Sequence, residues 1–521
     1  MTRPKSIVLD GHRLSLPQIE GVARHGADVA LDPNALNHIQ KCADSVQDIL
    51  NSDRIVYGVN TGFGVFSDKQ IHPSQAIQLT RNLILSHATG LGPSFPVDVV
   101  RAAMLIRANT LAQGHSGVRP ETISTLLQML SKNVVPKVPS QGSLGSSGDL
   151  APLAHMALVF SSDPDAPDSE PSGEAWFQGR LMTGSEAMRK ADIPRICLQP
   201  KEGLAITNGA TFTVAILALA CLDAHLLLRI AEISAALSIE ALLGVSSAFD
   251  KRLHLARPHP GQMSVAERIL ALTAGSSLLD STNHVQDAYS LRCAPQVQGP
   301  SWEILEFAER TTSREINSAT DNPLFFDGLA ISGGNFHGEP IGLASDYLKI
   351  ALSEVGAISE RRVYRLTNAD LNRGLPSMLV PNADLAGLQS GLMMLHYTAA
   401  SLVLENQALS NPDSTRSLST SAGQEDLNAN ATTAARHLHS VITNLRRILA
   451  IELVAASQAI DIRFQQIPGA RLGVGTQAAY ETVRKVLPLI AEDHFNVPDI
   501  HAIEQIIIDK QLLNAVDDAL A

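Results

Sequence analysis

Residues 434–463 read AARHLHSVITNLRRILAIELVAASQAIDIR. Their apolar side chains recur at the spacing that places them on one face of an α-helix. These side chains are Leu438, Val441, Ile442, Leu445, Ile448, Leu449 and Leu453. The stretch therefore predicts a long amphipathic helix that packs against other helices. Segments 341–364 and 385–407 are also long enough for bundle helices, and their glycine and alanine residues allow close helix approach.

The beginning of the chain has a different pattern. Short apolar runs at Ile7–Leu9 and Ile55–Tyr57 predict strands, and a helical period begins at Ser74. Because proline suits the first turn of a helix, we expect further helices to start at Pro96 and Pro120. This part of the sequence therefore predicts a mixed α/β region.

A polar, proline-rich stretch at residues 161–171 predicts a surface loop that separates two parts of the chain. We expect an N-terminal region at residues 1–200 and a long-helix domain at residues 201–521. Beyond residue 200 the pattern is nearly all helical, and it shows no fixed repeat that would indicate a solenoid. The expected fold class is mainly α, with a long central helical bundle that carries the mixed α/β N-terminal region.

The composition narrows the class of protein. Of the 521 residues, 45% are hydrophobic but only 4% are aromatic, which favours packed helices over a strand-rich sandwich. The 40 basic and 52 acidic residues give a net charge of −12 without a basic block, so we expect neither nucleic acid nor membrane surfaces as partners. Four scattered cysteines, an N-terminus without a signal-peptide core and the lack of an apolar run of ~20 residues that spans a bilayer predict a cytoplasmic protein.

A second informative stretch is GSLGSSGDLAPLAH, at residues 142–155. Small residues at this density let the backbone adopt strained turns and approach another backbone closely. Ser146, Ser147 and Gly148 have the make-up that self-cyclisation needs, since the Gly148 nitrogen, unhindered by a Cβ, can attack the Ser146 carbonyl carbon. Loss of water from Ser147 would then give a 4-methylideneimidazol-5-one (MIO) ring, an electrophile that no ordinary side chain supplies.

The alternative interpretation of this stretch is a flexible turn that caps the next helix, with Asp149 at the helix N-terminus. The surrounding residues favour the ring, because Gly-Ser-Leu-Gly-x-Ser-Gly-Asp-Leu-Ala-Pro-Leu-Ala-His resembles the signature of the histidine and phenylalanine/tyrosine ammonia-lyases. Ser146 departs from this signature, since the family usually has alanine there. Cyclisation uses only the backbone of that residue, so a hydroxymethyl group is compatible with it.

Further stretches resemble the same family, in the family's order, and extend the resemblance over essentially the whole chain. They surround Tyr57, Asn208, Tyr289 with Arg292, Phe336, and Glu425. Each has a simpler interpretation when it is taken alone: a packed tyrosine in a turn, a helix cap, a surface ion pair, a packed aromatic or a solvated acid. Their common order favours one shared site.

Ammonia elimination needs an electrophile to activate the amino acid and a base to take a weakly acidic β-proton. A tyrosine suits the second task if nearby positive potential lowers its pKa, which is ~10 when unperturbed. The resemblance implies that Tyr57 is this base and that Tyr289 assists from a lid loop. It also implies that Ser146, Ser147 and Gly148 form the MIO ring, so that no external cofactor is required.

The resemblance assigns substrate-binding roles as well. Arg292 would bind the substrate carboxylate, and Asn208 and Gln286 would form hydrogen bonds near that carboxylate and the ring. Phe336 would pack beside the ring. The family fold is mainly helical and homotetrameric, with each site shared between three subunits, and we expect the same assembly here.

The residues that follow the first predicted helical segment bear on the substrate. Ser86-His87 resembles the pair that the histidine-specific enzymes of the family have at this position. His87 and Glu425 can each form a hydrogen bond with an imidazole, whereas phenylalanine would leave them unpaired at roughly 1–3 kcal/mol per group. Gly423 and Leu427 depart from the histidine enzymes, which usually have asparagine and histidine at these positions.

The resemblance thus implies an ammonia-lyase that converts L-histidine to urocanate. The alternatives are a phenylalanine/tyrosine ammonia-lyase or a 2,3-aminomutase on the same scaffold, or a helical scaffold whose ring never forms. Other motifs are weak, since Gly473-Val474-Gly475 lacks the rest of a dinucleotide fingerprint. None of the 17 histidines lies in an HExxH motif, so we expect no metal site.

Overall fold

The computed structural model describes residues 6–163, 165–166 and 171–521. Their contacts divide the chain into two compact units, each built from three segments. The mixed unit comprises Met1–Leu222, Ala308–Asp346 and Pro412–Arg436, and the bundle unit comprises Asp223–Phe307, Tyr347–Asn411 and His437–Ala521. The domain boundary after residue 200 stays a prediction.

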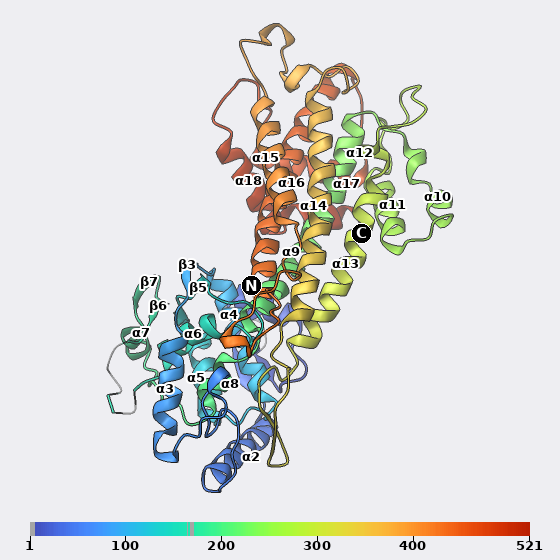
Figure 1. Cartoon of the computed structure of the whole chain (residues 1–521). Helices are drawn as coiled ribbons and strands as arrows, with labels where there is room; N and C mark the ends of the chain where they lie inside the picture. Colours follow the sequence, from blue (N-terminus) through green and yellow to red (C-terminus); the bar gives the residue numbers. More distant parts are fainter. Residues whose placement is uncertain (1–5, 164, 167–170) are drawn as a thin grey trace. The chain divides into compact units, whose positions relative to one another are not determined.

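The mixed unit combines short strands with helices of moderate length (Figure 1). Its strands are β1 (Ile7–Leu9), β2 (Val29–Leu31), β3 (Leu91–Ser94), β4 (Val135–Pro136), β5 (Pro139–Gln141), β6 (Glu174–Phe177), β7 (Arg180–Thr183), β8 (Leu324–Phe326) and β9 (Leu329–Ile331). Its helices are α1 (Leu16–Ala23), α2 (Pro33–Leu50), α3 (Ala76–His87), α4 (Val97–Ala112), α5 (Pro120–Ser131), α6 (Leu150–Phe160), α7 (Gly184–Lys190) and α8 (Glu202–Thr207). Short 3₁₀ turns lie at Gly64–Phe66, Pro73–Gln75 and Ser421–Gly423.

The sheets of the mixed unit are small. Strand β1 pairs with β2 in parallel, β3 with β5 and β8 with β9 are antiparallel pairs, and β4, β6 and β7 form an antiparallel sheet. Ile7–Leu9 is a strand as predicted, and helices begin within two residues of Ser74, Pro96 and Pro120. The predicted mixed α/β character is thus confirmed.

The predicted strand at Ile55–Tyr57 is wrong, because side chains there take up the backbone hydrogen bonds. The Asn60 side chain accepts a hydrogen bond from the Val56 nitrogen at 2.8 Å and donates one to the Arg54 carbonyl at 2.7 Å. Such local bonds offer the backbone an alternative to a strand ladder. The segment is therefore irregular at Ile55 and Val56 and leads into a turn at residues 57–59.

Long helices dominate the rest of the chain (Figure 1). The helices of this part are α9 (Thr211–Ala241), α10 (Lys251–Leu255), α11 (Pro260–Leu272), α12 (Tyr289–Arg292), α13 (Ala294–Glu315), α14 (Glu339–Thr367), α15 (Met393–Leu409), α16 (Ala431–Gln466), α17 (Val474–Val486), α18 (Val497–Ile508) and α19 (Gln511–Leu520). Further 3₁₀ turns lie at Ser246–Phe249, Ser377–Leu379 and Ala383–Leu385. The fold is mainly α-helical with a long-helix bundle, as the sequence predicts.

Predicted segments 341–364 and 434–463 lie within α14 and α16, respectively. The predicted helix at 385–407 begins later, at Met393, because Gly387 and Gly391 adopt positive φ angles of 96° and 56°. Of the predicted surface loop at 161–171, residues 164 and 167–170 lie outside the described residues. The described remainder contains no helix or named strand.

Polar contacts as well as apolar ones join the helices of the bundle unit. Buried Glu452 on α16 accepts hydrogen bonds from Ser234 and Ser238 on α9 and from Ser359 on α14. It also forms an ion pair with the buried guanidinium of Arg362 on α14. A buried carboxylate is stable only with such partners, so this cluster fixes the mutual register of α9, α14 and α16.

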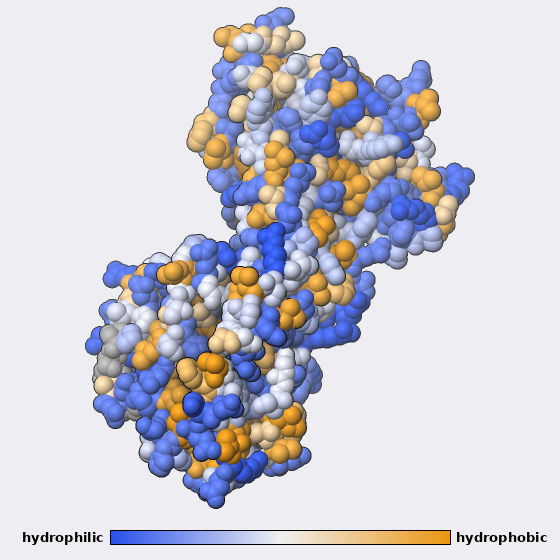
Figure 2. Space-filling model, viewed as in Figure 1, coloured by the Kyte–Doolittle hydropathy of each residue, from blue (hydrophilic) through white to orange (hydrophobic). Residues whose placement is uncertain are grey.

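The sequence predicts no uncharged run that is long enough to span a bilayer, and α9, the longest apolar helix, is indeed interrupted by Asp223 and Arg229. By length and composition this helix could cross a membrane. However, 78% of its most apolar stretch is buried inside the protein, which is typical of a core helix. On the visible face of both units, hydrophobic residues are scattered among hydrophilic ones (Figure 2).

Candidate active site

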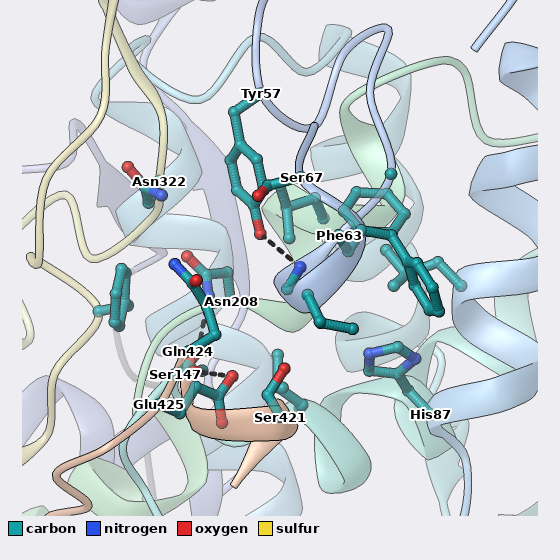
Figure 3. A pocket seen from close by; sticks show the side chains of 18 of the residues that line it. Tyr57, Phe63, Ser67, His87, Ser147, Asn208, Asn322, Ser421, Gln424 and Glu425 are labelled. Atoms are coloured by element: carbon teal, nitrogen blue, oxygen red, sulfur yellow. Dashed lines mark hydrogen bonds between the residues drawn. The ribbon is translucent and has the colours of Figure 1, made fainter. Parts of the chain in front are cut away.

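A cavity of about 1160 Å³ lies in the mixed unit. Its lining contains most of the residues that the sequence nominates for the site, and Figure 3 shows several of them directed toward one another. The nominated residues that line the cavity are Tyr57, His87, Ser146, Ser147, Asn208, Phe336 and Glu425. They come from segments up to 368 positions apart in the chain, yet they line one cavity.

The Ser147 side chain faces this cavity, and its peptide carbonyl is held from behind. The Ser147 hydroxyl donates to Glu425 Oε1 at 2.7 Å. The Asn208 amide donates to the Ser147 carbonyl oxygen at 2.6 Å, and the Gly209 nitrogen donates to the same oxygen at 3.4 Å. Two donors on one carbonyl oxygen can stabilise negative charge that develops there.

Gly148 is a position in this loop at which a side chain has no room. It has a φ of +92°, and a Cβ built on it would overlap the backbone of Gly209. The two glycines form an isolated parallel bridge, and the Asp149 nitrogen donates to the Gly209 carbonyl oxygen at 2.9 Å. The absence of a side chain therefore lets two loop backbones meet directly beside Ser147.

The hydroxyl of Ser146, where the family usually has alanine, forms hydrogen bonds within the loop and to a neighbouring segment. Its oxygen accepts a hydrogen bond from the buried Ala429 nitrogen at 2.8 Å and donates to the Leu144 carbonyl at 3.3 Å. Alanine at this position would leave the Ala429 nitrogen without that acceptor. Ser146 thus ties the loop to the segment that carries Glu425.

Asp149 does not cap the next helix, as the alternative interpretation of the loop requires. It occupies the N-cap position of α6, but in the described structure its side chain makes no capping hydrogen bond there. Instead the buried carboxylate accepts from the Thr213 nitrogen at 2.8 Å, in the first turn of α9, and from the Thr432 hydroxyl at 2.8 Å, in the first turn of α16. Asp149 therefore anchors the loop to two other helices.

Helix N-termini also surround the loop with positive potential. The Ala431 nitrogen at the start of α16 donates to the Leu144 carbonyl at 3.1 Å, and the Gly338 nitrogen just before α14 donates to the Gly145 carbonyl at 3.0 Å. Helix N-termini carry a partial positive charge. Together with the start of α9 they favour negative charge on the loop.

Tyr57 lies on the opposite side of the pocket from Ser147 and Glu425 in Figure 3. Its hydroxyl accepts a hydrogen bond from the Gly64 nitrogen at 3.3 Å, and its ring meets Phe63 edge-on with centroids 6.4 Å apart. Burial raises the pKa of Tyr57, and the Glu425 carboxylate adds to this, while the Gly64 bond opposes it. The residues around Tyr57 thus do not lower its pKa, as would be needed for it to act as a base.

His87 ends α3 at the edge of the cavity. Its Nδ1 lies 3.0 Å from the Ser86 hydroxyl. Burial lowers the pKa of His87, although the Leu83 carbonyl and the Glu425 carboxylate both oppose that change. The ring is therefore neutral near neutral pH and offers one donor and one acceptor.

Gln286, Tyr289 and Arg292 are not among the described residues that line this cavity. They belong to the bundle unit, where Tyr289 is 72% exposed. The Arg292 guanidinium stacks on the Tyr289 ring at 4.8 Å, and its Nε donates to the Asp287 carbonyl at 2.9 Å. The phenol and the guanidinium therefore share one side of α12, as their spacing predicts.

Other cavity residues escaped the sequence analysis. Gln424 and Ser421 lie beside Glu425 in the chain, so proximity to a nominated residue could have identified them. Phe63 follows Tyr57 by six residues and has the same signal, whereas Asn322 has none, because only the folded chain brings it to the cavity. In the part of the chain that the structure describes, no group of three or more His, Cys, Asp or Glu side chains could hold a metal ion.

Comparison with known proteins gives this geometry a context. The sequence profile of the aromatic amino acid lyases matches residues 14–485. The chain belongs to this family. The resemblance seen in the sequence is thus confirmed, and the protein is a carbon–nitrogen lyase.

Relatives within the aromatic amino acid lyase family match over nearly the full chain. The histidine ammonia-lyases of Alkaliphilus oremlandii and Caldanaerobacter subterraneus are 45% and 46% identical, with 99% and 96% of each chain covered. The crystal structure of histidine ammonia-lyase from Trypanosoma cruzi is 36% identical, with a TM-score of 0.89 over 99% of this chain and 95% of that one. Tyrosine aminomutase from Streptomyces globisporus is 34% identical, with a TM-score of 0.90 over 98% of both chains.

Proposed function

We propose that this lyase eliminates ammonia from L-histidine to give urocanate, through an MIO ring formed from Ser146, Ser147 and Gly148. The observation that carries the proposal is the setting of Ser147. Its hydroxyl faces the cavity, while Asn208 and Gly209 hold its carbonyl oxygen from the other side. A simple surface turn needs neither feature.

The loop residues fit the ring that the family implies. Attack of the Gly148 nitrogen on the Ser146 carbonyl carbon closes five atoms and expels that carbonyl oxygen as water, with one hydrogen from each of the Gly148 and Ser147 nitrogens. A second water takes the Ser147 hydroxyl and its Cα hydrogen. Gly148 has no Cβ to hinder its attacking nitrogen, and the Gly209 backbone leaves no room for one.

When formed, the ring supplies an electron-poor methylidene carbon that activates the substrate for loss of its amine. Asn208 and Gly209 would continue to donate to the Ser147 oxygen, which belongs to the same conjugated system. Phe336 lines the cavity and would exclude water from one side. These residues bind and polarise, and they need not move a proton.

Tyr57 is the proposed base for the β-proton. Because its pKa is raised in the single chain, it needs additional positive charge to ionise. The ammonium group of a bound substrate and Arg292 of a neighbouring subunit would supply that charge. This requirement supports a site that is shared between subunits, as in the proposed homotetramer.

The surface of the bundle unit is consistent with such an assembly. Helix α15 exposes Met394, Tyr397 and Leu404, which recur at helical spacing and are each more than 60% accessible. Large apolar side chains exposed in a row indicate a contact surface. We propose that this helix packs against other copies and that Gln286, Tyr289 and Arg292 reach the cavity of a neighbouring subunit.

Histidine is the proposed substrate because curated relatives named histidine ammonia-lyase are 43–46% identical over nearly the whole chain. The cavity supports this choice, since His87 and Glu425 offer polar partners to an imidazole. The second candidate is an aromatic aminomutase, favoured by the similarity to the solved tyrosine aminomutase. Gly423 and Leu427 are the departures that keep this candidate open.

Incubation of the purified protein with L-histidine, L-phenylalanine and L-tyrosine, each alone, tests the proposal. We expect ammonia and an ultraviolet-absorbing urocanate from histidine only. A β-amino acid product would identify an aminomutase, and preference for phenylalanine or tyrosine would overturn the histidine assignment. Intact mass should lie two waters below the value calculated from the sequence, whereas the Ser147→Ala protein should show no such loss.

A further inference from the structure

The hydroxyl of Ser86 connects the last turn of α3 to the His87 ring. It donates to the Leu83 carbonyl oxygen at 3.2 Å, one turn earlier in the same helix. A carbonyl oxygen can only accept, and a serine hydroxyl carries a single hydrogen. With that hydrogen directed to Leu83, the remaining lone pairs of the serine oxygen face His87 Nδ1, 3.0 Å away.

This arrangement favours one of the two ring nitrogens of His87 as the carrier of the hydrogen. Nδ1 then faces an oxygen whose own hydrogen is used elsewhere, which makes Nδ1 the donor. A neutral imidazole has one N–H, so Nε2 is left with a lone pair.

His87 lines the cavity, and Figure 3 shows its ring at the cavity's edge. With Nδ1 turned to Ser86, Nε2 is the ring nitrogen that remains for a ligand. Nε2 can accept a hydrogen bond but cannot donate one. The pocket wall at this point thus prefers a ligand that carries a donor.

We propose that Ser86 is a positioning residue that holds His87 in the Nδ1–H tautomer, so that the pocket selects substrates whose aromatic ring carries an N–H or O–H donor. This inference rests on the proposed function, and it names the substrate class of that site. An imidazole N–H satisfies His87. A phenyl ring has no donor for His87 Nε2. An unprotonated pyridine nitrogen would place its lone pair against the lone pair of Nε2.

Glu425 strengthens the same selection. Its Oε1 accepts from the Ser147 hydroxyl, which leaves as water in the proposed cyclisation, while its Oε2 accepts from Thr420 at 2.9 Å. Ring formation would therefore free Oε1 and give the cavity a second acceptor. His87 Nε2 and Glu425 Oε1 would then both accept hydrogen bonds from donors on the ligand.

The test compares L-histidine with 3-(4-pyridyl)-L-alanine, whose ring nitrogen only accepts at pH 8. Calorimetric dissociation constants are measured on the Ser147→Ala protein, which cannot turn over, with Ser86 intact, with Ser86→Ala and with Ser86→Thr. Removal of the Ser86 oxygen lets His87 place its N–H on either nitrogen. We expect the preference for histidine over the pyridyl compound to fall about fivefold, the value of one hydrogen bond.

Ser86→Thr keeps the hydroxyl and should restore the preference, which a loss of general packing would not do. An unchanged preference in Ser86→Ala, or no recovery in Ser86→Thr, overturns the role of Ser86. In either case, turnover of histidine by the otherwise unmodified enzyme still supports the proposed function. Failure of histidine to bind any of the three proteins overturns both the inference and the proposed substrate.

Discussion

Replacement of Asp149 by asparagine tests whether the loop must be anchored before it can cyclise. The Asp149 Oδ2 accepts from the Thr213 nitrogen, and Oδ1 accepts from the hydroxyls of Ser143, Thr213 and Thr432, all at 2.7–2.9 Å. Asparagine keeps one of these oxygens. If its amide nitrogen replaces Oδ2, it meets the Thr213 N–H with another donor, and the opposite rotamer gives up three hydroxyl bonds.

The milder of these two outcomes removes one hydrogen bond to a charged group and leaves a buried N–H unpaired. We therefore expect the free energy of unfolding to fall by about 3 kcal/mol. Urea denaturation followed by circular dichroism measures that change. Intact mass measures the fraction of chains that have lost two waters, which should drop well below that of the unsubstituted protein.

Asp32→Asn is the matched control. Asp32 caps α2 by accepting from the Asn34 nitrogen at 2.8 Å, and asparagine caps a helix about as well as aspartate. This control should change stability by less than about 0.5 kcal/mol and leave ring formation intact. If Asp149→Asn behaves like Asp32→Asn in both measurements, anchoring by Asp149 does not prepare the loop.

Four further changes test the site and the bundle. Ser147→Ala should keep the helical circular dichroism spectrum but lose activity by several orders of magnitude, and near-normal turnover would remove the electrophile from the mechanism. Tyr57→Phe should lose activity by about 10²-fold or more, through loss of the base, while its intact mass still shows the missing waters; a full-length mass without that loss would assign Tyr57 to maturation as well. His87→Leu should lower the ratio of kcat/KM for histidine over phenylalanine by about tenfold or more, and a constant ratio would contradict the role of His87. Burial raises the pKa of Glu240 from its ordinary value of 4.5 to about 7. The contribution of the protonated carboxyl group to the free energy of unfolding is therefore present below pH 4.5 and is lost as the pH rises through 7. Glu240→Gln should remove this loss when urea titrations at pH 5 and pH 8 are compared.

The sequence predicts the helices well where a long apolar period repeats. Residues 434–463 lie inside α16 because apolar side chains at helical spacing must be buried wherever the helix packs. The end of such a segment is harder to predict. At 385–392 the composition suits a helix, but the positive φ angles at Gly387 and Gly391 belong to a turn that only the complete fold requires.

The residues of the site are predictable from the sequence, but their contacts are not. Motif order nominates Ser147, Asn208 and Glu425, and the structure brings these three together around one hydroxyl and one carbonyl. The partner of Asp149 could not be predicted, because its side chain reaches a helix that begins 62 residues later instead of the helix beside it. The raised pKa of Tyr57 was equally hidden, since it follows from burial and from distant carboxylates.

The long-range anchoring of the loop also sets an order of events during protein synthesis. A ribosome makes residues 142–149 early, but their holding contacts come from Gly338, Ala429 and Thr432. The nascent chain must therefore grow by nearly another 300 residues before the loop has all of these contacts. Formation of the proposed MIO ring would then require that most of the chain has been made and folded, and a prematurely terminated polypeptide would not form it.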